Sequence, residues 1–236
     1  MRFLDAHCDT VLKVQSGSHN FCKGEGDGQV SLPGMISAGI CAQTFACFIL
    51  SREYPGAERI AAEHIIETIY DMIRCSDGRI QLAIDSATLH RACDDGPIAA
   101  IIALEGADPL EGRAESLRAF YGMGVRSVIP AWEDNAFSGT AFGQNTSLTP
   151  EGEKLVALCE ELRIMVDVSH LSDRAFARVM EITSQPVIAS HSNCRTICPS
   201  NRNLTDSMIR QIADRGGVLG INLSSDFLDP HFYVQE

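Results

Sequence analysis

Four strand-like apolar runs of this sequence each lead into side chains that can bind a metal ion. The first run leads into His7 and Asp9, the third into Glu105, the fifth into His170 and the sixth into His191. Imidazole nitrogens and carboxylate oxygens are common zinc ligands. Three imidazoles and two carboxylates are too many for one tetrahedral zinc ion, but they suit two neighbouring ions that share a carboxylate. We therefore expect two Zn²⁺ per chain, with other divalent metals as alternatives.

Each of these motifs is weak evidence when it stands alone. A His-x-Asp tripeptide is most often a capping aspartate beside a surface histidine, and a lone histidine at a strand end is as often a core or cap residue. Strand alternation nevertheless predicts that His7 and Asp9 share one face while Cys8 points the other way. Ligand-type side chains at the ends of four different strands make coincidence a poor explanation.

Two neighbouring metal ions would define the chemistry of such a site. At a separation of ~3.5 to 4 Å they can hold a hydroxide between them at neutral pH and polarise the carbonyl group that it attacks. The expected reaction is therefore the hydrolysis of a peptide or amide bond.

The elements that must position these side chains alternate along the chain. Helical patterns such as Glu58–Cys75 separate the strands, and Thr149, Ser172 and Thr205 are expected helix caps. This alternation predicts a parallel sheet covered by helices, and the absence of nucleotide-binding glycine motifs favours a closed barrel over an open sheet. Seven strands are expected, at Phe3–Asp9, Ala42–Leu50, Ile98–Leu104, Arg126–Ala131, Ile164–Val168, Val187–Ser190 and Val218–Leu223.

The expected fold is a TIM-type (β/α)8 barrel of the metal-dependent hydrolase kind. Such barrels build their active sites at the carboxyl ends of the strands, where the candidate ligands lie. We interpret residues 1–236 as a single barrel domain. Because only seven strands are found, the C-terminal helix and eighth strand are expected to be missing and the domain to be incomplete at that end.

Composition excludes several classes of partner. A chain with 45% hydrophobic, 21% charged and 6% aromatic residues is an ordinary globular protein. Its net charge of −12 disfavours binding to nucleic acids or anionic membranes. No apolar run approaches the ~20 residues of a membrane-spanning helix, and no signal peptide is recognised, so a cytoplasmic location is expected.

The nine cysteines include no C-x-x-C pair. An odd count without that motif is typical neither of a disulfide framework nor of a zinc ribbon. Eight of the cysteines are therefore expected to be reduced packing residues, namely Cys22, Cys41, Cys47, Cys75, Cys93, Cys159, Cys194 and Cys198.

Longer motifs resemble those of the membrane (renal-type) dipeptidase family, peptidase family M19, and of its bacterial branch in particular. The resemblance covers essentially the whole chain. It rests on His7-Cys8-Asp9, Leu104-Glu105-Gly106, the run from Asp167 to Asp173, the run from Ala189 to Asn193, and the run from Arg202 to Asp206.

The resemblance implies a role for each candidate residue. His7 and Asp9 would bind one zinc, His170 and His191 the other, and Glu105 would bridge the two ions as the catalytic carboxylate. Arg202 would hold the terminal carboxylate of a small dipeptide, a role for which its planar fork is suited. Trp132 stands where mammalian members carry a substrate-binding histidine, and it resembles the bacterial branch. For the assembly of the chain, a homodimer is one expectation.

Two other functions remain open. A different amidohydrolase-like enzyme, such as a deaminase or lactonase, usually begins with H-x-H and often uses a lysine on the fourth strand. This chain has H-x-D, and no lysine lies near Arg126–Trp132. The second alternative is an inactive, truncated scaffold, because the family carries an aspartate on its eighth strand for which Asp226 and Asp229 are not obvious substitutes.

Overall fold

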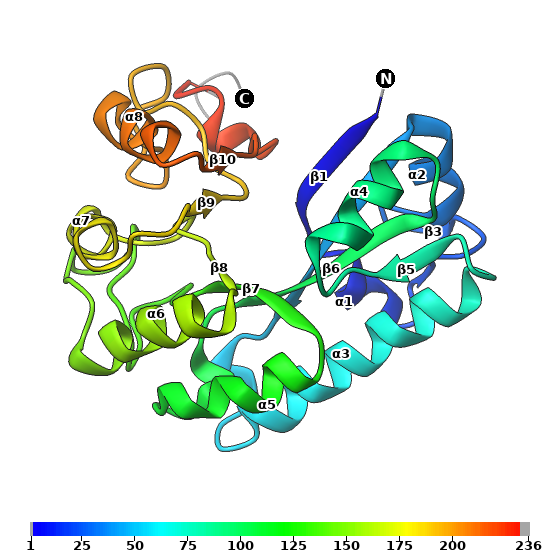
Figure 1. Cartoon of the computed structure of the whole chain (residues 1–236), viewed down its shortest axis with the longest axis horizontal. Coiled ribbons are helices and arrows are strands. Elements are labelled where there is room, and N and C mark those ends of the chain that lie inside the picture. The colour runs from blue at the N-terminus through cyan, green and yellow to red at the C-terminus, as the bar shows by residue number, and fades with distance from the viewer. Residues whose placement is uncertain (1, 232–236) are drawn as a thin grey trace. The chain divides into compact units, whose positions relative to one another are not determined.

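Each of the seven apolar runs overlaps a strand, and helices separate most of these strands along the chain (Figure 1). The computed structural model describes residues 2–231. Its Cα positions divide the chain into two units: unit 1 comprises Met1–Leu104 with Arg118–Arg126, and unit 2 comprises Glu105–Leu117 with Ser127–Glu236. Each unit is described by itself below, and the single-domain organisation of residues 1–236 stays a prediction.

Unit 1 contains a parallel sheet whose central strands are buried. Strand β1 pairs in parallel with β4, β6 follows β4 in the strand order, and β5 pairs in parallel with β6. Nearly every residue of β4 and β6 is buried, as expected for parallel strands covered on both faces. The strands are β1 (Phe3–Cys8), β2 (His19–Asn20), β3 (Glu25–Gly26), β4 (Ile40–Phe48), β5 (Ile80–Leu82) and β6 (Ile98–Glu105, of which Glu105 belongs to unit 2).

Helix α3 forms over the range that the apolar periodicity predicts, Glu58–Cys75. Its buried face carries residues at helical spacing, among them Ala62, Ile65, Ile69 and Met72, which pack toward the sheet. The other helical segments of unit 1 are α1 (Thr10–Gln15), α2 (Leu32–Ala38), η1 (Ser51–Glu53), α4 (Ser86–Asp94) and α5 (Leu117–Gly122, of which Leu117 belongs to unit 2).

Unit 2 continues the same alternation with shorter strands. The end of β7 pairs in parallel with β8, a bridge from Asp167 to Ile188 leads on to β9, and β9 pairs in parallel with β10. The strands are β7 (Val125–Ile129), β8 (Met165–Val166), β9 (Ile188–Ala189) and β10 (Val218–Leu219), and β10 is the last strand among residues 2–231. The helical segments are η2 (Asp108–Leu110), η3 (Ala114–Ser116), α6 (Pro150–Leu162), α7 (Asp173–Ile182), α8 (Asp206–Asp214) and η4 (Ser225–Phe227).

The three expected helix caps of unit 2 are confirmed. The hydroxyls of Thr149, Ser172 and Thr205 each accept a hydrogen bond from a backbone N–H three residues on, which satisfies one unpaired donor at the start of α6, α7 and α8. These caps fix where each helix begins. Among residues 2–231, no helix has the length and apolar character needed to cross a membrane.

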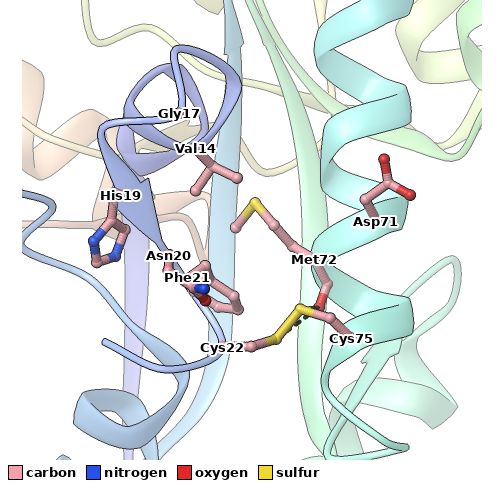
Figure 2. A pocket seen from close by; sticks show the side chains of 9 residues that line it. All are labelled: Val14, Gly17, His19, Asn20, Phe21, Cys22, Asp71, Met72 and Cys75. Atoms are coloured by element: carbon pink, nitrogen blue, oxygen red, sulfur yellow. Dashed lines mark hydrogen bonds between the residues drawn. A yellow bond between two sulfur atoms is a disulfide. The ribbon is translucent and has the colours of Figure 1, made fainter. Parts of the chain in front are cut away.

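The expectation that Cys22 and Cys75 are reduced is wrong. They form a disulfide that joins the turn after β2 to the last residue of α3, with a Cα–Cα distance of 6.3 Å. Sequence spacing gave no hint of this pair, because 53 positions separate the two residues. The bond lies at one side of a pocket of about 320 Å³ within unit 1, which His19, Phe21 and Met72 also line (Figure 2). The remaining seven cysteines are free thiols.

Removing this cross-link is expected to lower the free energy of unfolding by about 2 to 4 kcal/mol, because the bond restricts the unfolded chain. Urea unfolding of the chain and of its Cys22→Ser/Cys75→Ser double variant measures the difference. A reductant should lower the stability of the parent chain to that of the variant and leave the variant itself unchanged. Equal stabilities of the two oxidised proteins would contradict the prediction.

Candidate metal centre

Glu105 is the last residue of β6, and its side chain is buried although it carries a carboxylate. The residue is 3% exposed. Gly106 follows with a φ of 84°, a conformation that favours glycine, and its N–H donates to the carbonyl of Ile129. The chain therefore turns sharply after the strand and leaves the carboxylate at the strand's carboxyl end, as the sequence predicts.

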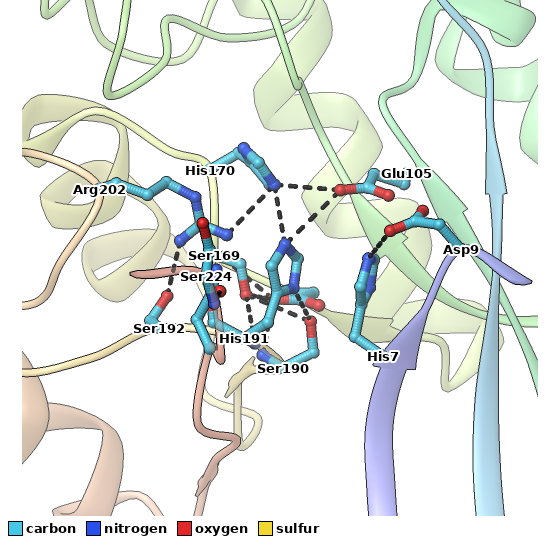
Figure 3. A network of polar contacts seen from close by, with 12 residues as sticks. His7, Asp9, Glu105, Ser169, His170, Ser190, His191, Ser192, Arg202 and Ser224 are labelled. Carbon is cyan, nitrogen blue, oxygen red and sulfur yellow. Dashed lines mark hydrogen bonds and ion pairs between the residues drawn. The ribbon is translucent and has the colours of Figure 1, made fainter. Parts of the chain in front are cut away.

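His170 and His191 face this carboxylate from the loops after β8 and β9 (Figure 3). Nε2 of His170 lies 3.0 Å from Oε1 of Glu105, and Nε2 of His191 lies 3.6 Å from the same oxygen. The two Nε2 atoms are 2.9 Å apart. Three of the five predicted ligands thus converge within unit 2.

The buried guanidinium of Arg202 determines which nitrogen of His170 carries the proton. Nη2 of Arg202 lies 3.2 Å from Nε2 of His170, and since a guanidinium only donates, this nitrogen must accept. Burial and the charge of Arg202 lower the pKa of His170, against an opposing effect of Glu105. The imidazole is therefore neutral at neutral pH, with its proton on Nδ1 and its lone pair on Nε2.

Hydroxyl groups connect His191 to a buried carboxylate. Oγ of Ser169 donates to Oδ1 of Asp167 at 2.6 Å, because a carboxylate can only accept. Oγ of Ser169 lies 3.2 Å from Oγ of Ser190, and Oγ of Ser190 lies 2.7 Å from Nδ1 of His191. A metal ion on Nε2 of His191 would require the proton to sit on Nδ1, where the Ser190 hydroxyl can accept it.

The donor set therefore fits a metal ion. Two imidazole nitrogens and one carboxylate oxygen face one another at 2.9 to 3.6 Å. A cation would stabilise such a cluster, and zinc prefers nitrogen and oxygen ligand atoms of these types. Because Arg202 donates to the Nε2 of His170 that would bind the ion, metal binding requires Arg202 to release that hydrogen bond.

Arg202 is itself an unusual buried cation. It is 2% exposed, Nη1 donates to Oγ of Ser192 at 2.8 Å, and its buried Nε has no hydrogen-bond partner among residues 2–231. Desolvation lowers the pKa of Arg202 to about 10, while Asp167 and Glu105 oppose the shift, so the guanidinium is charged at neutral pH. A partly unsatisfied buried guanidinium is suited to bind a carboxylate.

Trp132 lies beside His170, and its role in substrate binding stays a prediction. Its ring centroid is 6.0 Å from that of His170, and the residue is half-buried. It can contact a ligand held between His170 and Arg202.

His7 and Asp9 lie together in unit 1. Oδ2 of Asp9 is 3.5 Å from Nε2 of His7. The expectation that Asp9 continues the strand is wrong: β1 ends at Cys8, and Asp9 is the first residue beyond it, at the start of α1 with a φ of −98°. The carboxylate reaches its neighbour through this turn and not through strand alternation. Cys8 is buried, as predicted.

Ser190 and Ser192, which flank His191, were missed by the sequence reasoning. Ser190 contacts His191, and Ser192 contacts Arg202. The Ser-His-Ser tripeptide itself was the available signal, because hydroxyl groups next to a ligand histidine commonly orient it. Asp167 accepts hydrogen bonds from both Ser169 and the backbone N–H of Ser190.

Loss of the Ser190 hydroxyl is expected to lower zinc affinity about 10- to 100-fold, as is usual for groups that orient metal ligands. In Ser190→Ala nothing holds the proton of His191 on Nδ1. Competition with a chromophoric chelator measures the affinity, and Ser190→Thr, which keeps a hydroxyl, should restore much of it. Equal affinities of Ser190→Ala and the parent chain would refute the orienting role. Circular dichroism checks that both variants fold.

Known proteins match the chain over nearly its whole length. The sequence model of the membrane dipeptidase family (peptidase family M19) matches residues 1–234. An uncharacterized protein in the pqqA 5′ region of Klebsiella pneumoniae is 36% identical over 165 residues, which are 66% of this chain and 61% of that protein. This chain therefore matches less than two thirds of the relative's length.

Solved structures agree with the family match. The crystal structure of a dipeptidase of family M19 superposes with a TM-score of 0.90 at 28% identity, covering 98% of this chain and 74% of that one. A metallo peptidase from Rhodobacter sphaeroides, liganded with a phosphinate mimic of the dipeptide L-Ala-D-Ala, gives a TM-score of 0.90 at 27% identity and covers 98% and 76%. The expected fold class, that of a TIM-type (β/α) barrel hydrolase, is confirmed.

Proposed function

Because the chain belongs to the membrane dipeptidase family, peptidase family M19, we propose that it is a zinc-dependent dipeptidase that hydrolyses the peptide bond of small dipeptides. The observation that carries this proposal is the cluster of imidazole nitrogens and a carboxylate oxygen of Glu105, His170 and His191 beside the buried guanidinium of Arg202. The donors suit a metal ion, and the guanidinium suits the free carboxylate that every unblocked dipeptide carries.

The assignment of ligands to two ions is the one that the resemblance to the family implies. His170 and His191 would hold one zinc ion, His7 and Asp9 would hold the other, and Glu105 would serve both as the catalytic carboxylate. The measured zinc stoichiometry tests this assignment. When bound, the ions would polarise the scissile carbonyl and promote ionisation of a water molecule near neutral pH.

The other residues bind and orient the substrate. Arg202 accepts the terminal carboxylate in its planar fork, which fixes the distance from that carboxylate to the peptide bond. A peptide extended at its C-terminus would place an uncharged amide at this buried cation. Trp132 covers the bound dipeptide and excludes water. The Asp167, Ser169 and Ser190 chain holds His191 in the tautomer that can bind metal.

Further properties of the whole protein belong to the same proposal. L-Ala-D-Ala is a candidate substrate, because a mimic of it is bound by the similar Rhodobacter peptidase. We retain the homodimer and the cytoplasmic location as predictions.

A direct experiment tests the function. The full chain is supplied with two equivalents of Zn²⁺, its bound metal is measured after dialysis, and it is assayed on dipeptides, L-Ala-D-Ala included, with tripeptides and C-terminal amides for comparison. We expect two ions per chain and cleavage of dipeptides that a chelator removes and zinc restores. Zinc binding without cleavage of any dipeptide would overturn the proposal. Activity on a deaminase or lactonase substrate would then indicate another hydrolase, and no activity would indicate a scaffold.

A further inference from the structure

Two free cysteines of unit 1, far apart in sequence, hold their sulfur atoms side by side. Sγ of Cys41 lies 3.2 Å from Sγ of Cys93, and 52 positions separate the residues. Cys41 is near the start of β4 and 3% exposed, whereas Cys93 is in the last turn of α4 and is exposed. A disulfide bond is about 2.05 Å long. Closure therefore needs the sulfurs to approach by only about 1 Å, which small side-chain rotations supply.

The helix that carries Cys93 is held in place next to β4. Arg2 donates to the carbonyls of Ala92 and Asp94 at 3.1 and 2.9 Å and pairs with Asp95 at 2.6 Å, so the end of α4 is fastened on both sides of Cys93. Helix α4 also contacts β4. The two sulfurs are thus kept close by the fold and not by a chance encounter of mobile side chains.

We propose that Cys41 and Cys93 are a site of reversible disulfide formation, at which a low-molecular-weight disulfide such as oxidised glutathione closes a second cross-link in unit 1. The thiolate of exposed Cys93 attacks the glutathione disulfide, which releases one glutathione thiolate and leaves a mixed disulfide. The Cys41 thiolate then attacks the Cys93 sulfur and expels the second glutathione. Two protein thiols are oxidised, one disulfide is reduced to two thiols, and their two protons pass to the glutathione products.

The surroundings of Cys41 bear on the rate of the second step. Burial and the adjacent Cys93 thiol raise the pKa of the Cys41 thiol, and Arg2 opposes this only in part. The thiolate of Cys41 is therefore scarce at neutral pH, and the second step is expected to speed up as pH rises. Cys93 is the point of entry because it is exposed.

The position of the pair separates this site from the proposed catalytic one. Cys41 is near the amino end of β4, whereas barrel enzymes carry their reacting groups at the carboxyl ends of the strands. Closing the bond is expected to stabilise unit 1 without changing dipeptide hydrolysis. The inference therefore does not depend on the proposed function.

The native chain is oxidised, and its free thiols are then counted in denaturant, where the buried ones also react. Incubation with oxidised glutathione should lower the count of free thiols from seven to five, and peptide mapping without reductant should find Cys41 joined to Cys93. The melting temperature should rise by roughly 5 to 10 °C. Cys93→Ser, which begins with six thiols, should show neither the cross-linked peptide nor the stabilisation.

A matched control keeps the experiment decisive. Cys194→Ser removes a partly exposed thiol that contacts the carboxylate of Asp206, and this variant should lose two thiols on oxidation just as the parent chain does. A count that stays at seven in the parent chain, or a cross-link from Cys93 to another cysteine, would overturn the proposal. Glutathione that remains attached to Cys93 without closure would overturn it as well.

Discussion

Replacing Glu105 by glutamine is expected to reduce kcat/KM for dipeptides on the order of a thousandfold. The substitution keeps the size of the side chain but exchanges an acceptor for an amide that donates. Its N–H groups would satisfy the lone pairs on Nε2 of His170 and His191, which now face the carboxylate at 3.0 and 3.6 Å. A loss of 3 to 5 kcal/mol is usual when one partner of a buried polar cluster is removed, and each ~1.4 kcal/mol is a factor of ten in rate.

Zinc stoichiometry and steady-state kinetics of Glu105→Gln measure this effect together. We expect fewer than two ions per chain and no recovery of rate at high substrate concentration. Glu181→Gln, which changes an exposed carboxylate paired with Arg178, is the matched control and should behave like the parent chain. A Glu105→Gln protein that retains both ions and its full rate would show that this carboxylate is not a ligand.

Replacing Arg202 by lysine is expected to raise KM for dipeptides on the order of a hundredfold. Lysine keeps the positive charge but loses the planar fork that can bind both oxygens of a carboxylate. It would also leave Oγ of Ser192 and Nε2 of His170 without their present donors. Truncating one partner of a buried charged contact commonly costs about 2 to 5 kcal/mol of binding.

The substrate series distinguishes this role from a general loss of structure. Dipeptides with a C-terminal amide lack the carboxylate, so the parent chain and Arg202→Lys should handle them almost equally poorly. Arg178→Lys changes a half-buried arginine in the middle of α7 and is the control for the arginine-to-lysine substitution itself. An equal rise of KM for acids and amides in Arg202→Lys would exclude carboxylate recognition by this residue.

The parts of the fold that could be predicted are those with long hydrophobic patterns. Helix α3 was placed correctly at both ends because its apolar stripe runs over eighteen residues. Strands β2, β3 and β5 were missed, since two or three residues are too few to show alternation. The Cys22–Cys75 bond could not be foreseen, because it depends on how α3 packs beside the turn after β2 and not on local spacing.

The candidate site was predictable where a metal-binding side chain lies at the end of a strand with a clear apolar pattern. Glu105, His170 and His191 converge because parallel strands bring their carboxyl ends to one edge of a sheet. Asp9 was assigned to the strand, since the pattern could not distinguish the last residue of a strand from the N-cap of the following helix. The hydroxyl chain through Ser169 and Ser190 depends on side-chain rotamers, on which sequence is silent.

The hydrogen bond from Arg202 to Nε2 of His170 has a thermodynamic consequence. A metal ion at His170 must displace the guanidinium, and a displaced guanidinium is free to bind an anion. We therefore expect cation and carboxylate ligands to bind with positive cooperativity, so that by reciprocity each raises the affinity of the other by the same factor. A dipeptide analogue that cannot be cleaved should accordingly slow the loss of metal to a chelator, and metal should tighten the binding of that analogue.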